Sequence, residues 1–187
     1  GTLLDAAARH RVRRVVHVSS IVALPPVRPA RAPGVPHAPT AYGASKTAAE
    51  ELVNRYVDGG GDAVIVRPTR VYGPGPWNDA NGATRLVAMY LQGRLRVRLL
   101  DGGAEANYVH VDDVAHGIEL AAERGRRGGA YVLGGENATL AGFLAAVAAV
   151  TGVHRRLVPV PPQAVLPAAA LAAAWCRLGG RASLTPS

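Results

Sequence analysis

Residues Thr40–Pro68 read TAYGASKTAAEELVNRYVDGGGDAVIVRP, and this stretch decides the fold. Thr40 can start a helix that runs to about Val57, because apolar side chains recur at helical spacing after it. Three consecutive glycines then end the helix. The apolar, β-branched run Asp62–Arg67 that follows, closed by a proline, predicts a short buried strand.

A second β-branched run lies upstream of this helix. Val12–Ser19 (VRRVVHVS) follows an amphipathic helical segment at the start of the chain, and it predicts another buried strand. The proline-rich stretch Pro25–Pro39 between this strand and the helix predicts a loop. Strand, helix and strand in this order are typical of a parallel sheet with crossover helices, so the expected fold class is α/β.

The remainder of the chain alternates shorter elements. We expect helices at Ala83–Gln92, at Asp112–Glu123 with Asp112 as its cap, and at Leu140–Val150 with Thr139 as its cap. We expect strands at Leu95–Leu100, Tyr108–Val111, Ala130–Leu133 and Leu157–Val160.

The chain has a single lysine, Lys46, among 21 basic side chains, and it follows Tyr42 by four residues. Residues four apart share one face of a helix, so both side chains can reach the same small volume. A nearby ammonium favours the phenolate, which lets a tyrosine act as general acid or base near neutral pH. Arginine is larger and permanently charged, and cannot easily replace lysine here. The alternative is a solvent-facing Tyr–Lys pair without function.

Three segments meet at one rim of the predicted sheet. In doubly wound sheets, ligands bind beyond the carboxyl ends of the strands. The first strand ends in Ser19-Ser20, the second in Arg67–Pro74 (RPTRVYGP), and the helix with Tyr42 and Lys46 lies between them. Each segment alone could be an ordinary turn or connection. Their combination around the only lysine favours a functional site.

On these segments the chain resembles an extended short-chain dehydrogenase/reductase. The matching signatures are Val18-Ser19-Ser20, Tyr42–Lys46 (YGASK), Arg67–Pro74 and Val109–Ala115 (VHVDDVA). The resemblance implies the C-terminal part of a Rossmann-type doubly wound parallel sheet, plus a small mixed α/β substrate domain. It assigns 1–76 and 106–124 to a partial NAD(P)-binding domain, and 77–105 and 125–187 to a truncated substrate-binding domain.

The same resemblance implies roles for individual residues. Tyr42 is the catalytic acid/base, Lys46 lowers its pKa and binds the nicotinamide ribose, and Ser20 holds the substrate oxygen. The residues expected beside the cofactor, NAD or NADP, are Ser19, Tyr42, Lys46, Pro68, Thr69 and Val71. The residues expected beside the substrate are Ser20, Trp77, Asn78 and Arg85, although Trp77 and Asn78 could equally be loop anchors.

Two departures from the family pattern bear on function. The Gly-rich phosphate loop and the side chain that selects NAD or NADP would precede Gly1. We therefore expect that an N-terminal part is missing. Without it, the chain as given should not bind a dinucleotide tightly. Ala106-Asn107 stands where sugar-nucleotide members usually carry Arg-Asp, which predicts an uncharged, largely apolar or unphosphorylated substrate unless Arg85 and Arg181 supply the missing positive charge. This difference makes the chain more similar to dihydroflavonol reductases, 3β-hydroxysteroid dehydrogenases and hopanoid-associated sugar epimerases. The chain also resembles the last of these groups at Gly134–Leu140 (GGENATL).

The composition argues against several classes of binding partner. The net charge of +8 suggests nucleic-acid binding as a candidate function. However, the arginines form scattered short groups and aromatic residues make up only 5% of the chain, so we expect no nucleic-acid partner. The lone Cys176 excludes a disulfide framework, and His110, Asp112 and Asp113 are too few ligand types for us to expect a metal. Without a signal peptide or a clean apolar run of about 18 residues, we expect no membrane span and a cytoplasmic protein.

Three functions stay open on this reading. The leading one is an NAD(P)-dependent oxidoreductase acting on a small-molecule secondary alcohol or ketone. The second is an epimerase or dehydratase of a sugar or sugar nucleotide, which would use the cofactor catalytically. The third, a non-catalytic dinucleotide sensor, has no need of Ser20, Tyr42 and Lys46. We also expect a homodimer, in which the small residues Ala44, Ala48 and Ala49 allow close approach of helices.

Overall fold

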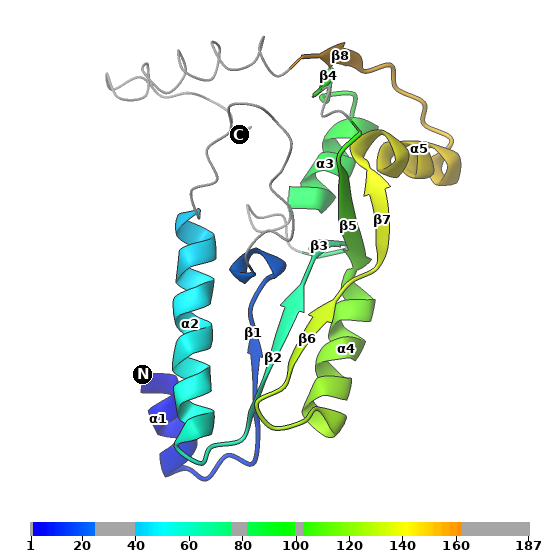
Figure 1. Ribbon diagram of the computed structural model, residues 1–187. Helices are drawn as coiled ribbons and strands as arrows, with labels where there is room; N and C mark the ends of the chain where they lie inside the picture. The colour runs from blue at the N-terminus through cyan, green and yellow to red at the C-terminus, as the bar shows by residue number, and fades with distance from the viewer. Residues whose placement is uncertain (1, 25–39, 76–81, 100–102, 162–187) are drawn as a thin grey trace. The chain divides into compact units, whose positions relative to one another are not determined.

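The computed structural model describes residues 2–24, 40–75, 82–99 and 103–161. The chain forms two compact units, one of residues 1–85 with 106–138 and the other of residues 86–105 with 139–187. In chain order (Figure 1) the elements are α1 (Thr2–Arg9), β1 (Val15–Val18), the 3-10 helix η1 (Ile21–Ala23), α2 (Ala41–Asp58), β2 (Ala63–Pro68), β3 (Arg70–Tyr72), α3 (Gly82–Leu91), β4 (Val97–Leu99), β5 (Glu105–His110), α4 (Val111–Arg124), β6 (Ala130–Leu133), β7 (Glu136–Thr139), α5 (Leu140–Thr151) and β8 (Val158–Val160).

The first unit has helices on both faces of a parallel sheet, which confirms the predicted α/β class. The strand order is β1-β2-β6, and both pairings are parallel. Helices α1 and α2 cover one face through a core of Val53, Ala63 and Ile65, whereas α4 covers the other through Val64, Val66 and Ala121 (Figure 1). The central strand β2 is buried on both faces, which explains its continuous apolar run.

The first unit also contains a second sheet that sequence reasoning did not foresee. Its order is β3-β5-β7, with Arg70 opposite Tyr108 in a parallel pairing. We expected a loop where β3 lies, and no strand at β7. Both strands are short, and β3 follows β2 after the single residue Thr69. Their stability comes from pairing with a strand distant in sequence, and local periodicity does not report such pairing.

The helix caps test the local predictions. Thr40 and Thr139 cap α2 and α5 as expected, each accepting a 3.0 Å bond from the backbone N–H of a glycine, Gly43 and Gly142 respectively. The prediction for α4 is wrong: His110 is the N-cap, and its Nδ1 accepts from the Asp112 N–H at 3.3 Å. Asp112 instead lies in the first turn, where a carboxylate is favoured by the helix dipole.

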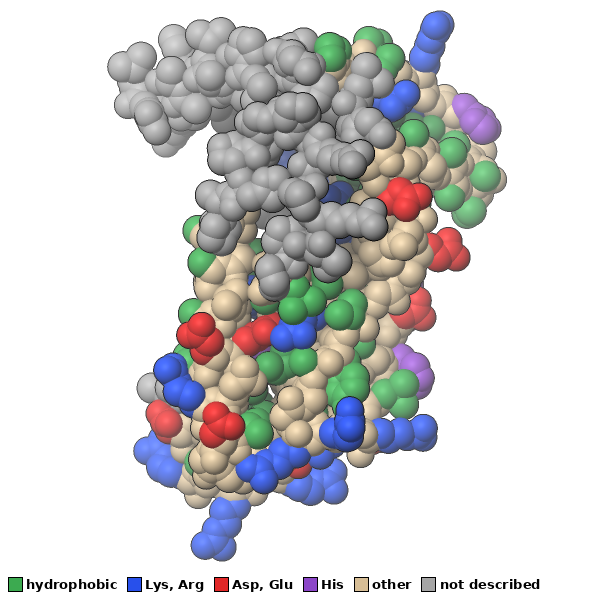
Figure 2. All heavy atoms as spheres, in the orientation of Figure 1, with side chains coloured by type: hydrophobic (Ala, Val, Ile, Leu, Met, Phe, Trp, Pro, Cys, Tyr) green, Lys and Arg blue, Asp and Glu red, His purple; other side chains and the backbone are tan. Residues whose placement is uncertain are grey.

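Basic side chains of the first unit gather where its helices end. Arg9, Arg55 and Arg124 lie in the last turns of α1, α2 and α4. Figure 2 shows arginine side chains collected at the lower end of this face. Cations at helix C-termini complement the helix dipole, which gives these arginines a structural role far from the strand ends.

The second unit pairs β4 with β8 in parallel, with Val97 opposite Val158. Its helix α5 buries Phe143, Leu144 and Ala148. Among the helices of the described residues, none is both long and apolar enough to cross a membrane. The predicted loop Pro25–Pro39 lies outside the described residues, as do Trp77 and Asn78.

Candidate active site

Helix α2 brings Tyr42 and Lys46 to the carboxyl end of β1. The Lys46 ammonium donates to the carbonyl oxygen of Val18, the last residue of β1, at 3.3 Å. It also lies 5.7 Å from the centroid of the Tyr42 ring. Tyr42 is 56% exposed, whereas Lys46 is half-buried. A tyrosine hydroxyl that is open to solvent and has a cation beside it is available to an incoming ligand.

The serine pair follows directly after β1, and its two side chains have different surroundings. Ser19 extends the sheet through its N–H, which donates to the Val66 carbonyl at 2.8 Å, and the residue is buried. Ser20 is the N-cap of η1, and its Oγ accepts a long 3.5 Å bond from the Val22 N–H. The hydroxyl of Ser20 is therefore only weakly held by the protein.

Close packing of η1 on α2 holds Ser20 near the Tyr42 turn. A Cβ added to Gly43 would lie 3.1 Å from the Val22 carbonyl oxygen, so only glycine fits here without a shift. The Thr47 hydroxyl of α2 donates to the Ala23 carbonyl at 3.2 Å. The structure thus brings the three predicted catalytic residues into one corner, between the end of β1 and the first turns of α2.

A partly buried ion pair lies directly below this corner, and the sequence pattern alone does not predict it. Arg67 of β2 binds Glu50 of α2 through two bonds, Nε to Oε1 at 2.9 Å and a terminal nitrogen to Oε2 at 2.7 Å. The pKa of Glu50 is lowered, chiefly by the Arg67 hydrogen bond, with burial opposing; the pKa of Arg67 is raised mainly by the same bond. Glu50 stands four residues after Lys46, and this helical spacing was the signal available.

His17 completes the polar layer between β1 and α2. Burial lowers its pKa most, the Lys46 charge lowers it further, and the Glu50 charge opposes both. Its Nε2 atom is buried without a hydrogen-bond partner. The buried hydroxyl of Ser19 has no partner of good geometry either, although its proximity helps to lower the pKa of Glu50. This layer is less fully hydrogen-bonded than most protein interiors.

The segment after β2 is held by one amide side chain, that of Asn107 in β5. Its Oδ1 accepts from the Thr69 hydroxyl and from the Gly135 N–H, both at 2.8 Å. Its Nδ2 donates to the Gly135 carbonyl at 3.0 Å and to Asn137 Oδ1 at 2.8 Å. An aspartate could not make the last two bonds. The Thr69 hydroxyl is thus used inside the fold, while Pro68 is buried beside it.

The turn after β3 depends on a glycine. Gly73 has φ +140°, and a Cβ there would lie 2.5 Å from a methyl group of Val111. Its N–H and its carbonyl both bond the Thr84 hydroxyl at 3.1 Å. Val71 in β3 and Arg85, next to Thr84 in α3, are both half-buried. Within the described residues, no group of three His, Cys, Asp or Glu could hold a metal ion.

Comparison with known proteins defines the class of this molecule. The profile of the NAD dependent epimerase/dehydratase family matches residues 1–134. The chain belongs to this family.

The relatives include reductases, dehydratases and epimerases. A 4-hydroxy-2-methyl-3-oxo-4-farnesyl-3,4-dihydroquinoline-1-oxide ketoreductase of Stigmatella aurantiaca is 34% identical over 91% of this chain and 52% of its own length. A dTDP-glucose 4,6-dehydratase of Actinoplanes is 33% identical over 71% of this chain and 42% of its own. The UDP-glucose 4-epimerase of Thermus thermophilus, solved with NAD, has a TM-score of 0.65 at 32% identity, over 86% of this chain and 55% of its own. The chain spans about half the length of the relatives it matches.

Proposed function

We propose that this chain belongs to an NAD(P)-dependent oxidoreductase that reduces a ketone or oxidises a secondary alcohol, with Tyr42 as the acid/base. One observation carries the proposal. The only lysine of the chain lies 5.7 Å from the Tyr42 ring and bonds the end of β1, where ligands bind in doubly wound sheets. A surface pair without function would not need a contact with the strand end.

In the reductive direction, Tyr42 gives its proton to the carbonyl oxygen as that oxygen becomes an alcohol. The Lys46 ammonium stabilises the phenolate that remains, and Ser20, whose own bond is long, donates to the same substrate oxygen. When bound, NADH or NADPH would supply the hydride for the carbonyl carbon. Oxidation of an alcohol reverses these steps.

The residues present suit a nicotinamide cofactor. Lys46 has three N–H donors, and only one of them is used by a described residue, so the others are available to ribose hydroxyls. The half-buried Val71 offers apolar surface for the flat nicotinamide ring, whereas the buried Pro68 fixes the backbone of this segment, and Ser19 lies at the end of the neighbouring strand. Thr69 contributes backbone and methyl group, since its hydroxyl is bonded to Asn107. We propose the first unit for the cofactor and the second for part of the substrate.

A second candidate is an NAD-dependent sugar or sugar-nucleotide epimerase or dehydratase, which the Actinoplanes relative favours. Against it stands Ala106, which lacks the cation expected for a diphosphate. The Stigmatella relative is named for a farnesylated ketone and matches more of this chain. We therefore propose an uncharged, largely apolar substrate.

A competition assay on the full-length enzyme separates the two candidates. Hydrophobic ketones, UDP-sugars and dTDP-sugars would be offered together with NADH or NADPH, while cofactor absorbance and products are followed. The oxidoreductase consumes one cofactor per ketone reduced. Turnover of nucleotide sugars alone, with no net cofactor consumed, would replace the first candidate by the second.

We further propose a homodimer that forms through α2. Ala44 and Ala48 are exposed, and Leu52, four residues further along the helix, is 37% exposed. Such a stripe allows close approach of a second helix. Sedimentation at micromolar concentration should give a dimer for the native protein and a monomer for Ala48→Glu. A native monomer would contradict the proposal.

A further inference from the structure

The positive charge of this chain is concentrated in the second unit. Residues 86–105 and 139–187 contain seven arginines but only two acidic residues, Asp101 and Glu105. This unit therefore carries a formal charge of +5 out of the chain's +8, although it is the smaller of the two. No aspartate or glutamate occurs after Glu136.

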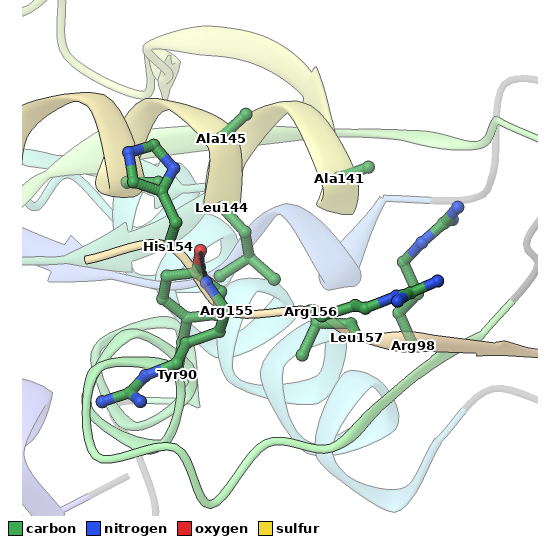
Figure 3. Close-up of a pocket in the computed structure, with 10 residues that line it drawn as sticks. Tyr90, Arg98, Ala141, Leu144, Ala145, His154, Arg155, Arg156 and Leu157 are labelled. Atoms are coloured by element: carbon green, nitrogen blue, oxygen red, sulfur yellow. Dashed lines mark hydrogen bonds between the residues drawn. The ribbon is translucent and has the colours of Figure 1, made fainter. Parts of the chain in front are cut away.

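A cavity of about 510 Å³ lies among these arginines (Figure 3). One wall is apolar: Ala141, Leu144, Ala145 and Ala148 recur on a single face of α5. The opposite side is formed by Tyr90 and by the segment that leads into β8. Its volume falls in the range that accommodates a small organic ligand.

The arginines that line the cavity are of two kinds. Arg155 has a structural use: a terminal nitrogen donates to the Leu91 carbonyl at 2.9 Å, and its backbone N–H donates to the Tyr90 hydroxyl at 3.1 Å. These bonds tie the segment before β8 to the C-terminal end of α3. Within the described part of the chain, the guanidinium groups of Arg98 and Arg156 make no hydrogen bond or ion pair with another residue.

The strand pairing explains why Arg98 and Arg156 share the cavity. Arg98 of β4 lies opposite Pro159 of β8, three residues beyond Arg156. In the view of Figure 3 both guanidinium groups extend to the same side, away from His154 and Tyr90. Glu105 is not among the lining residues. The positive charges of Arg98 and Arg156 thus line one cavity, and no Asp or Glu is among its lining residues in the described part of the chain.

We propose that this cavity binds an organic anion, with a phosphate-type group on Arg98 and Arg156 and an apolar body on the α5 face. Guanidinium groups match the geometry of phosphate oxygens and bind them through paired, charge-assisted hydrogen bonds. The apolar face of α5 favours a ligand that carries a hydrocarbon or ring beside its charge over a free inorganic ion.

The proposal is tested by titrating the full-length protein with phenyl phosphate in a calorimeter. Phenol and inorganic phosphate serve as ligands that lack the charge or the apolar body. Arg98→Gln and Arg156→Gln should each weaken phenyl phosphate binding by about 10- to 100-fold, the effect of losing a charged hydrogen bond. Arg94→Gln removes an exposed arginine of the same unit that does not line the cavity, and it should bind like the native protein.

Three results would overturn the proposal. Phenyl phosphate fails to bind at millimolar concentration, or it binds the glutamine variants as well as the native protein. In the third, Arg94→Gln loses as much affinity as the cavity variants, which would mean that net charge alone attracts the ligand. Circular dichroism and a thermal melt of each variant confirm that the second unit is folded.

The phosphate could belong to the substrate or to a separate ligand, and inhibition kinetics distinguish the two. Phenyl phosphate that competes with the substrate indicates a substrate-borne anion, and the expectation of an unphosphorylated substrate is then wrong. Inhibition or activation that is not competitive indicates a separate anion. The cavity lies wholly in the second unit, so the proposal does not depend on the role of Tyr42.

Discussion

Successive turns of helix α2 carry polar side chains in opposite surroundings. Tyr42 is 56% exposed, and Lys46 beside it bonds a single backbone carbonyl. Glu50, one turn further on, is 8% exposed and is held by Arg67 through two short bonds. The turns that carry Tyr42 and Lys46, here called the upper turns, are open to a ligand. The turn that carries Glu50, here called the lower turn, is fixed to β2. One helix face therefore carries both the candidate chemistry and the anchor that holds it against the sheet.

The sharpest test of the upper turns is Tyr42→Phe in the full-length enzyme. We expect turnover to fall by about 10²- to 10⁴-fold, because only the proton donor is lost. Cofactor affinity should stay within a few-fold of the native value. Steady-state kinetics and a cofactor titration measure both, and activity close to native would remove Tyr42 from the mechanism.

A substitution in the lower turn should reduce the unfolding free energy of the protein. Glu50→Ala leaves the half-buried Arg67 guanidinium without its partner, which costs about 3 kcal/mol of unfolding free energy, the lower end of the cost for a fully buried pair. Glu51→Ala, at the exposed neighbouring position, is the matched control and should change stability by less than about 0.5 kcal/mol. Urea denaturation of both variants decides the matter. Equal stability of the two would mean that the ion pair does not anchor α2.

The contrast between the turns also separates what the sequence could predict from what it could not. Helix α2, its Thr40 cap and the strands on either side of it follow from local periodicity and capping chemistry. Tyr42 and Lys46 could be singled out from the sequence because a single lysine in an arginine-rich chain is conspicuous. Whether these residues catalyse a reaction stays a prediction.

Glu50 and the second sheet were missed for a different physical reason. A glutamate at an amphipathic helix position is usually solvated, and only the arrival of Arg67 from β2 makes burial of this one favourable. Strand β3 similarly exists because β5 lies beside it. His110 caps α4 through a ring nitrogen, which a search for Ser, Thr, Asp or Asn does not find.

Lys46→Arg asks whether the upper turns need lysine itself or only a positive charge. The guanidinium is larger than an ammonium, so the bond to the Val18 carbonyl and the approach to Tyr42 should both change. We expect kcat/KM to fall by about 100-fold, at the lower end of the effect of an acid/base group. Steady-state kinetics with thermal melts as a folding control measure this. Near-native turnover would reduce the single lysine to coincidence.

The smallest expected effect concerns His17, which lies between the two turns. Its lowered pKa means that the folded protein keeps the ring neutral while the unfolded chain takes up a proton below the usual value of 6.5. Stability should therefore decline as the pH falls from about 6.5 toward the lowered pKa, by at most about 1.4 kcal/mol per pH unit for one proton. Below about 4.5 the lowered pKa of Glu50 adds a further loss, because its stabilisation disappears as the carboxylate is protonated.

His17→Phe removes the first of these two slopes and leaves the second. The control substitution is His116→Phe on α4, which removes a histidine whose side chain is 69% exposed and leaves His17 and Glu50 in place. Unfolding free energies from urea curves at half-unit steps of pH between 4 and 8 give the comparison. An unchanged slope between pH 6.5 and 5 in His17→Phe would show that His17 titrates alike in the folded and unfolded chain. Burial beside Lys46 would then have no measurable effect on its protonation.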